Sequence, residues 1–450
     1  MNCGNVVASN TRSSSSRSGT KPEKGTMIAE VLSKENLTVA YQQVLKNKGA
    51  AGIDGRSVDD LSLFLREHWH SIKHQVENGS YQPAPILGVE IPKKNGKTRL
   101  LGIPTVVDRV LHQALHQRLS PVFEPDFQRH SYGFRPNRNA HQAITQALEN
   151  INDGYQDIID IDLKSFFDEV NHELLMTLIY RRVKCSLTLK LIRKFLRAPI
   201  SINGKLVKRR KGVPQGSPLS PLLSNIILNE LDKELERRGH RYVRYADDFS
   251  IYLRSKTAAR RVGNSMYLFL RNKLRLPINR EKSGIRRPSQ FYMLGYGFVP
   301  VFRKGSKGKY QLVVDRSALR RLKAKIKYIT RKTIPAGFDE RIARLNLVLK
   351  GWINYFKLAN VYGKLRDIDV WVRRRLRYCI WHDWKKPNRK MKNLIRLGIK
   401  PGMAYAWSRT RMGGWAVAGS PILGTTITLD RLGKRGYISM LSYYLELTHG

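Results

Sequence analysis

Acidic residues, cysteines and long apolar runs are all scarce in this sequence. No run of 18 apolar residues occurs, so no membrane-spanning helix is predicted and no membrane partner is expected. The three cysteines, Cys3, Cys185 and Cys379, are odd in number and far apart. This argues against a disulfide scaffold and a Cys-rich zinc module, and it favours a reducing compartment. We expect a bacterial cytoplasmic location rather than an organellar one, because the N-terminal segment has no clear amphipathic helix.

The scarcity of acids leaves a large positive charge. The chain has 35 Asp and Glu against 82 Lys and Arg, a formal net charge of +47. Such an excess opposes a compact state unless a polyanion neutralises part of it. Residues 301–450 alone hold 34 Lys and Arg and 8 Asp and Glu, a net charge of +26. A solvated basic surface is the simpler alternative, but this magnitude favours a nucleic-acid partner whose binding weakens with salt.

The 450 residues, 41% of them hydrophobic, suffice for a large core and two or three domains. Residues 1–26 are polar and Ser-rich, which predicts disorder. Apolar periodicity predicts helices in residues 36–82 (with a turn at 49–55), 108–119, 174–196 and 218–238. Hairpins are predicted at 86–101 and 200–207, each around an Asn-Gly pair, and a short strand at 158–163. Beyond Phe298 we expect long basic helices in 317–333 and 340–385, followed by a basic-aromatic region with several turns.

The tetrapeptide Tyr245-Ala246-Asp247-Asp248 lies between two apolar stretches. Strand, turn and strand is the natural local interpretation, with both aspartates at the tip of a hairpin. Adjacent carboxylates repel each other, and a pair of divalent cations would remove that repulsion. An ordinary exposed turn is an equal alternative when the tetrapeptide is taken alone.

A second carboxylate, Asp162, ends the apolar strand at 158–163 and could reach a neighbouring hairpin tip. Asp162 and Asp247 would then hold two Mg²⁺ ions about 3.5–4 Å apart, with Mn²⁺ as a possible substitute. We expect Asp248 to contribute more weakly. Asp160 could replace Asp162 in principle, and Asp168 is expected to have a local structural role.

Two further segments suit a phosphate ligand. The loop at residues 212–221 contains glycines that allow close backbone approach, and it opens a helix. The hairpin at 86–101 carries cations that could clamp a triphosphate, although a solvated hairpin edge explains them equally well. These cations are Lys93, Lys94, Lys97 and Arg99.

The order of these segments resembles that of reverse transcriptases, and among them the group II intron-encoded proteins, which combine a reverse transcriptase with a maturase. The resemblance covers residues 36–450 and includes segments 47–55, 91–93, 99–109, 132–136 and 351–356. It implies an α+β right-hand polymerase fold of fingers and palm, then an all-α thumb (the maturase X domain) and a small basic C-terminal DNA-binding region. The implied domains are a disordered lead at 1–30, fingers and palm at 31–312, thumb at 313–385 and DNA-binding region at 386–450.

The resemblance also implies roles for single residues. Asp162, Asp247 and Asp248 would be the catalytic carboxylates, with Leu163 beside them in the metal and nucleotide site. Phe167 would be the aromatic gate beneath the deoxyribose, with Phe166 as the alternative. Lys282 would protonate the leaving pyrophosphate. The residues that would contact the incoming nucleotide are Lys93, Arg99 and Gln215.

The C-terminal third places basic residues among aromatics, a pattern that suits phosphate contact and base stacking. The expected nucleic-acid contacts are Arg373, Arg374, Arg375, Arg377, Lys385 and Lys386. Solvated arginines around an aromatic helical core are the alternative. Because no cysteine pair follows Cys379, we expect no HNH endonuclease. His112 and His116 lack a third ligand and are expected to be core or surface histidines.

Together these features predict an RNA-directed DNA polymerase that binds its group II intron RNA, assists splicing, and primes cDNA synthesis at a DNA target for intron mobility. The expected partners are intron RNA, a template–primer duplex, target DNA and dNTPs. A splicing factor with a decayed polymerase is one alternative, and the intact carboxylates argue against it. A domesticated enzyme in defence or repair is another.

Overall fold

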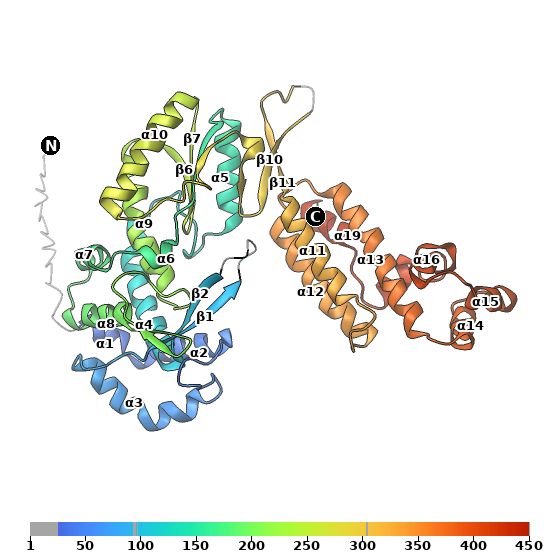
Figure 1. Cartoon of the computed structure of the whole chain (residues 1–450), viewed down its shortest axis with the longest axis horizontal. Helices are drawn as coiled ribbons and strands as arrows, with labels where there is room; N and C mark the ends of the chain where they lie inside the picture. The colour runs from blue at the N-terminus through green and yellow to red at the C-terminus, as the bar shows by residue number, and fades with distance from the viewer. Residues whose placement is uncertain (1–25, 93–95, 97, 303–304, 450) are drawn as a thin grey trace, which may run out of the picture. The chain divides into compact units, whose positions relative to one another are not determined.

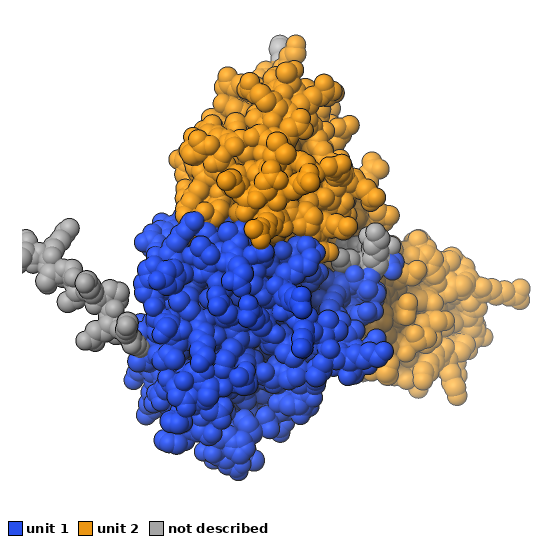
Figure 2. Space-filling model, turned by 60° about the vertical axis from the view of Figure 1, so that its left-hand side comes forward, with its two compact units in different colours: residues 1–126, 167–227 blue, residues 127–166, 228–450 orange. Residues whose placement is uncertain are grey.

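The computed structural model describes residues 26–92, 96, 98–302 and 305–449, and its chain forms two compact units (Figures 1 and 2). The first unit consists of the described parts of residues 1–126 and 167–227. The second consists of 127–166 and the described parts of 228–450. Two helices pass from one unit to the other, α6 (Phe166–Glu169) and α9 (Ser220–Arg237). No described helix is both long and apolar enough to cross a bilayer.

The first unit contains a four-stranded sheet in the order β2-β1-β4-β5. Its strands are β1 (Ile86–Pro92), β2 (Thr98–Ile103), β4 (Ile200–Ile202) and β5 (Lys205–Val207). The antiparallel pairs β1–β2 and β4–β5 confirm both predicted hairpins. Asn203 and Gly204 have φ angles of 50° and 81°, the left-handed conformation that a two-residue hairpin turn requires.

The first unit also contains helices, and one predicted helix proves to be two. The helices of this unit are α1 (Thr26–Val31), α2 (Lys34–Asn47), α3 (Leu61–Glu77), α4 (Val106–Phe123), a 3₁₀ turn (Glu124–Asp126), α7 (His172–Arg182) and α8 (Ser186–Arg197). The predicted helix at 174–196 is broken because Val183 and Cys185 adopt extended backbone angles. The buried Val183 side chain anchors the turn between α7 and α8.

His112 lies inside the first unit. It is buried on α4, with its ring nitrogen 3.0 Å from Ser217 Oγ and its ring edge-on to Phe195. Burial, with some help from the charge of Arg109, lowers the pKa of His112 to about 3, so the ring is neutral at physiological pH. His112 is thus a core residue, as expected, and His116 one turn later is half-buried.

The second unit contains two sheets and the C-terminal helices. One sheet has the order β6-β7-β3-β8, formed by β3 (Asp157–Ile161), β6 (Arg241–Tyr245), β7 (Asp248–Leu253) and β8 (Gly284–Arg286). The other has the order β11-β10-β9, formed by β9 (Tyr292–Met293), β10 (Tyr296–Pro300) and β11 (Tyr310–Val314). A 3₁₀ turn (Pro288–Gln290) precedes β9.

The four-stranded sheet of this unit has a different helix against each face. On one face, Ile159 approaches α10 (Lys256–Phe269), which continues into a π-helical turn (Leu270–Leu274). On the other, Ile158 shares a core with Ala143 and Ile144 of α5 (Ala140–Asn152). Side chains alternate along a strand, so Asp160 projects from the same face as Ile158. Asp162, directly beyond β3, continues this alternation.

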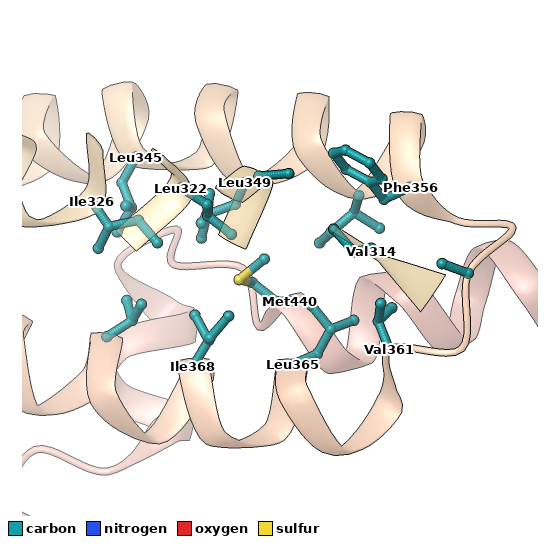
Figure 3. Close-up of a cluster of buried hydrophobic side chains, with 14 of the residues drawn as sticks. Val314, Leu322, Ile326, Leu345, Leu349, Phe356, Val361, Leu365, Ile368 and Met440 are labelled. Atoms are coloured by element: carbon teal, nitrogen blue, oxygen red, sulfur yellow. The ribbon is translucent and has the colours of Figure 1, made fainter. Parts of the chain in front are cut away.

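The C-terminal part of the second unit is helical. Its helices are α11 (Arg316–Ile329), α12 (Phe338–Phe356), α13 (Tyr362–Asp383), α14 (Pro387–Arg396), α15 (Pro401–Ser408), α16 (Gly414–Gly419), α17 (Pro421–Gly424), α18 (Leu429–Lys434) and α19 (Met440–His449). The helical stretch predicted at 340–385 consists of two helices, α12 and α13. Figure 3 shows the buried side chains that pack between α11, α12, α13 and α19, with Met440 at their centre.

A buried carboxylate fastens the last helix to this core. Asp369 on α13 accepts hydrogen bonds from Tyr437 Oη at 2.8 Å and Ser439 Oγ at 2.7 Å. It also accepts from the backbone N–H groups of Met440 and Leu441, both at 2.9 Å. These N–H groups belong to the first turn of α19, where helical N–H groups have no partner within the helix. Asp369 therefore caps a helix from a neighbouring helix.

We expect Asp369→Ala to lower the free energy of unfolding by about 3 kcal/mol, because it leaves buried donors without an acceptor. Denaturant unfolding measures this loss, and faster hydrogen exchange in α19 localises it. Asp367→Ala is the matched control, since Asp367 is an exposed residue of the same helix and its loss should cost less than about 0.5 kcal/mol. Equal effects of the two substitutions would contradict the assignment.

Candidate active site

The Tyr245-Ala246-Asp247-Asp248 segment forms the predicted strand, turn and strand. Tyr245 ends β6 and pairs with Asp248, the first residue of β7. Ala246 and Asp247 form the two-residue turn, and Ala246 has a φ of 58°. Asp247 thus lies at the tip, whereas Asp248 begins the second strand. A left-handed backbone is unfavourable for alanine, so the turn needs support from its surroundings.

One support is the segment before α5. Tyr132 N–H donates to Arg244 C=O, and Arg244 N–H donates to His130 C=O, both at 2.9 Å. These bonds bring Gly133 against the turn. A Cβ atom on Gly133 would lie 2.3 Å from the backbone nitrogen of Ala246, so no larger residue fits without moving the turn.

A second support is a fully buried ion pair. Arg244 on β6 and Asp232 on α9 are both 0% exposed. Arg244 Nε donates to Asp232 Oδ1 at 2.8 Å, and Arg244 Nη1 donates to the Ala246 carbonyl at 2.9 Å. The guanidinium therefore holds the first residue of the turn while its charge is compensated by the carboxylate.

Asp162 lies beside this hairpin in the same sheet. Ile161 pairs with Phe249, and one step further along this antiparallel register Asp162 comes opposite Asp248. The predicted convergence of the strand end and the hairpin is therefore confirmed in the backbone. Leu163, next to Asp162, is 6% exposed, so only its backbone could meet a ligand.

A segment that follows α10 holds Asp162 in place. Asn279 Nδ2 donates to Asp162 Oδ2 at 2.9 Å, and Asn279 N–H donates to the Asp162 carbonyl at 2.8 Å. Asp162 N–H donates to Ser283 Oγ at 3.0 Å. Lys282 Nζ lies 3.3 Å from Asp162 Oδ2, so the structure places Lys282 beside one of the candidate carboxylates.

Burial and neighbouring carboxylates raise the pKa of Asp247 and Asp248. Burial, followed by the charges of Asp247, Asp162 and Asp160, raises the pKa of Asp248 to about 6, and Lys282 partly offsets this. Burial and then the charge of Asp162 raise the pKa of Asp247. Excess negative charge at this point is thus poorly compensated, and a bound cation would relieve it.

A pocket of about 450 Å³ opens at these residues. Asp162, Asp248 and Lys282 line it together with Asp160, whose carboxylate accepts from Arg286 Nε at 2.9 Å. In the part of the chain that the structure describes, no three His, Cys, Asp or Glu side chains are arranged to hold a metal by themselves. Carboxylate oxygens suit Mg²⁺, which commonly takes one or two protein carboxylates and completes its shell with water and phosphate. The residues therefore fit a cation that is shared with a substrate.

The two phenylalanines after Asp162 differ in exposure. Phe166 is 2% exposed, whereas Phe167 is half-buried and belongs to the first unit. Phe167 C=O accepts from Val213 N–H at 2.7 Å, which ties it to the loop at 212–221. Of the two rings, Phe167 therefore has the larger exposed surface for a ligand. Asp168 lies beside the same loop, against Gly212.

The remaining nucleotide candidates also lie in the first unit. Gln215 C=O accepts from Gly102 N–H of β2 at 2.8 Å, and a Cβ on Gly216 would lie 2.6 Å from the Gly102 oxygen. The loop at 212–221 thus packs directly on β2. Arg99 lies on the same strand and is exposed. Lys93, Lys94 and Lys97 lie outside the described residues.

The C-terminal candidates occupy two kinds of position. Three α13 arginines donate to groups of the protein itself, namely Arg374 to Trp415 C=O, Arg375 to Thr330 and Arg377 to Ile427 C=O. Arg373 is half-buried, and Lys385 and Lys386 are exposed before α14. The contacts give Arg374, Arg375 and Arg377 a structural use in addition to the predicted one.

The sequence reasoning missed Asp232, Arg244 and Asn279. Asp232 lies among the apolar positions of α9, and Arg244 lies among the inward positions of β6. A charged residue at a position that the pattern reserves for apolar side chains is the signal that could have indicated both. Asn279 is 117 residues from its partner and carries no such signal.

Family models match two parts of the chain. Residues 91–298 match "Reverse transcriptase (RNA-dependent DNA polymerase)", and residues 319–398 match "Group II intron, maturase-specific domain". The two matches lie on either side of residues 299–318.

Two curated proteins are similar over much of their length. Protein YkfC of Escherichia coli (strain K12) is 32% identical over 306 residues, which cover 59% of this chain and 80% of YkfC. Group II intron-encoded protein LtrA of Lactococcus lactis subsp. cremoris is 30% identical over 418 residues, which cover 73% of this chain and 69% of LtrA. A chain of a solved partial Cas6-RT-Cas1–Cas2 complex is 24% identical with a TM-score of 0.37, covering 55% of this chain and 43% of its own. That last likeness is too weak to support an argument.

We expect Asp232→Asn to lower the free energy of unfolding by about 3–5 kcal/mol, because it leaves the buried Arg244 without a counter-charge. In the double variant Asp232→Leu/Arg244→Met the loss should be much smaller than the sum of the losses in Asp232→Leu and Arg244→Met alone. Chemical denaturation of all four proteins gives this coupling. Lys233→Met, at an exposed pair on the same helix, should cost less than about 1 kcal/mol. Additive losses would show that the pair is not coupled.

Proposed function

Because this chain belongs to the group II intron-encoded proteins, a family of reverse transcriptases with a maturase domain, we propose that Asp162, Asp247 and Asp248 are its polymerase centre. The chain is an RNA-directed DNA polymerase. In the reaction the 3′-hydroxyl of a primer attacks the α-phosphate of a dNTP. A P–O bond forms to the primer, the bond to the β-phosphate breaks, and pyrophosphate leaves. The observation that carries the proposal is the meeting of Asp162 and the Asp247–Asp248 hairpin in one sheet, at a pocket.

Two Mg²⁺ ions, or Mn²⁺ in their place, suit this centre. Asp162 and Asp247 would be the principal ligands, with Asp248 as a further one and the Leu163 backbone beside them. When bound, the ions would supply positive charge to the attacking and leaving oxygens. The support in this chain is the place of Asp247 and Asp248 beside Asp162, where burial and then the neighbouring carboxylate charges raise the pKa of both.

Other side chains would position the nucleotide. Arg99 and Lys93 would hold the triphosphate, and Gln215 would support the nucleotide and its template. Phe167 would lie beneath the deoxyribose, where its bulk excludes a 2′-hydroxyl. Lys282 would donate a proton from its ammonium group to the leaving pyrophosphate. The proximity of Lys282 to Asp162 supports the last assignment, and the exposure of Phe167 supports its choice over Phe166.

The helical part of the second unit would serve the maturase function. We propose that residues 313–385 form the thumb and that residues 386–450 contact target DNA. This helical part would bind intron RNA during splicing, and cDNA synthesis would start at the DNA target. The support is the charge of residues 301–450, where 34 basic residues face 8 acidic ones. The exposed Lys385 and Lys386 are the plainest candidates for phosphate contact.

We expect Asp247→Ala to abolish Mg²⁺-dependent dNTP incorporation on poly(rA)/oligo(dT), with a loss of at least about 10³-fold because it removes a metal ligand. The same variant should support splicing of the intron RNA nearly as well as the wild type, because the basic helical region is unchanged. Asp153→Ala, an exposed acid in the second unit, is the control for both assays. If the wild-type protein incorporated no dNTP, the polymerase assignment would be rejected. If Asp247→Ala lost dNTP incorporation and splicing support equally, the separation of the two activities would be rejected.

The two phenylalanines should respond differently to removal of their rings. Phe167→Ala should raise the incorporation of rNTPs relative to dNTPs while leaving the fold intact, because its ring is partly exposed. Phe166→Ala should instead lower the free energy of unfolding by about 3–5 kcal/mol, because its ring is buried. Single-nucleotide incorporation with matched dNTP and rNTP, together with denaturant unfolding, separates the two. Relaxed sugar selection in Phe166→Ala alone would reverse the assignment.

A further inference from the structure

Lys282 contacts a carboxylate that would hold a metal ion in the proposed centre, that of Asp162. Lys282 Nζ lies 3.3 Å from Asp162 Oδ2, and both side chains line the pocket beside Asp248. An ammonium group is a compact point charge that attracts carboxylate oxygens. At this distance it compensates part of the negative charge that the three carboxylates concentrate here.

The same Asp162 oxygen has a second donor of a different kind. Asn279 Nδ2 donates to Oδ2 at 2.9 Å, and this amide is neutral. The backbone of Asn279 is fixed to the Asp162 carbonyl, and Ser283 N–H donates to the Asn279 carbonyl at 2.9 Å. The Asn279 donor therefore belongs to a hydrogen-bonded turn that does not depend on the Lys282 side chain.

Lys282, in contrast, is free to move at its end. Its side chain is 61% exposed, while that of Asp162 is 35% exposed. A partly exposed pair of this kind contributes little free energy, so a stronger cation can displace it. A divalent cation at Asp162 has twice the charge and would repel the ammonium group.

We propose that Lys282 is a substitute cation, which occupies Asp162 in the metal-free centre and leaves it when a divalent ion binds, while Asn279 remains and keeps the carboxylate oriented. This inference rests on the proposed polymerase centre and deepens it. Metal binding releases the Lys282 ammonium into the pocket, where the leaving pyrophosphate would need it. Asn279 acts as a positioning residue, and Lys282 is the cation that the metal displaces.

The test measures metal binding rather than activity. Mn²⁺ is titrated into the full-length protein without nucleic acid or nucleotide, and free Mn²⁺ is followed by electron paramagnetic resonance. Lys282→Met should bind Mn²⁺ about two- to fivefold more tightly, because a competing cation is gone. Lys282→Arg should restore binding close to wild type. Asn279→Ala should bind about tenfold more weakly, as is typical when a partner that orients a metal ligand is lost.

Arg280→Met is the matched control. It removes one positive charge from the same segment, but Arg280 donates to Tyr267 Oη at 2.7 Å rather than to Asp162. Its Mn²⁺ affinity should stay within about 1.5-fold of wild type, since exposed charges at longer range are screened by salt. If Arg280→Met tightened Mn²⁺ binding as much as Lys282→Met, the gain would come from the loss of any nearby positive charge, and the proposal would be overturned.

Two further outcomes separate this inference from the function on which it rests. Unchanged or weaker binding by Lys282→Met, with binding lost in Asp162→Ala, would overturn the inference and leave the metal centre standing. Binding that Asp162→Ala does not alter would overturn both. The unfolding midpoint of every variant, measured without metal, shows whether that variant is still folded when its Mn²⁺ affinity is compared with that of the wild type.

Discussion

The buried pair of Arg244 and Asp232 is the constraint on which the candidate centre depends. Two charges removed from water are costly, and their mutual attraction rarely yields a net gain in stability. Here the guanidinium also binds the Ala246 carbonyl, while Gly133 is pressed against the nitrogen of the same residue. Ala246 is thereby held at a backbone angle it would not adopt alone. The position of Asp247, the next residue, follows from that turn, so the ion pair fixes geometry rather than adding stability.

Scarcity of acids shapes the rest of the second unit. With 8 acidic residues for 34 basic ones in residues 301–450, most arginines have no carboxylate to pair with. Several donate to backbone carbonyls instead. Buried Arg341 donates to Ile329 C=O at 3.1 Å, and Arg377 donates to Ile427 C=O at 2.9 Å. Ile329 is the last residue of α11, so its carbonyl has no donor within that helix, and Ile427 lies in the segment between α17 and α18. A basic residue in this region is therefore not by itself evidence of a nucleic-acid contact. The basic residues that alternate with aromatics on α13 include some that bind the protein's own groups.

How much the sequence could predict depends on the distance between partners. The hairpins and the strand before Asp162 rest on alternation and Asn-Gly turns, which are local, and they were predicted correctly. The break between α7 and α8 could not be predicted, because the apolar spacing of the helical run continues through Val183. The contacts that hold the candidate centre in place could not be predicted from local sequence patterns. Asn279 meets Asp162 across 117 residues, and Gly133 meets Ala246 only because an isolated bridge joins Ser131 to Arg244. No spacing within either segment encodes that meeting.

The charges of the whole chain and of the centre have opposite signs, and this has a consequence for the order of binding. A net charge of +47 would draw a nucleic acid toward the protein, but such attraction is screened beyond about 8 Å at physiological salt. At contact distance a phosphate in the proposed centre would meet Asp162, Asp247 and Asp248, and burial together with the neighbouring carboxylate charges raises the pKa of Asp247 and Asp248. A single ammonium, that of Lys282, cannot balance three carboxylates and an approaching triphosphate. Productive binding of the nucleotide at this point therefore requires cations to arrive before it or together with it, so the basic surface can recruit the polyanion but cannot complete the centre.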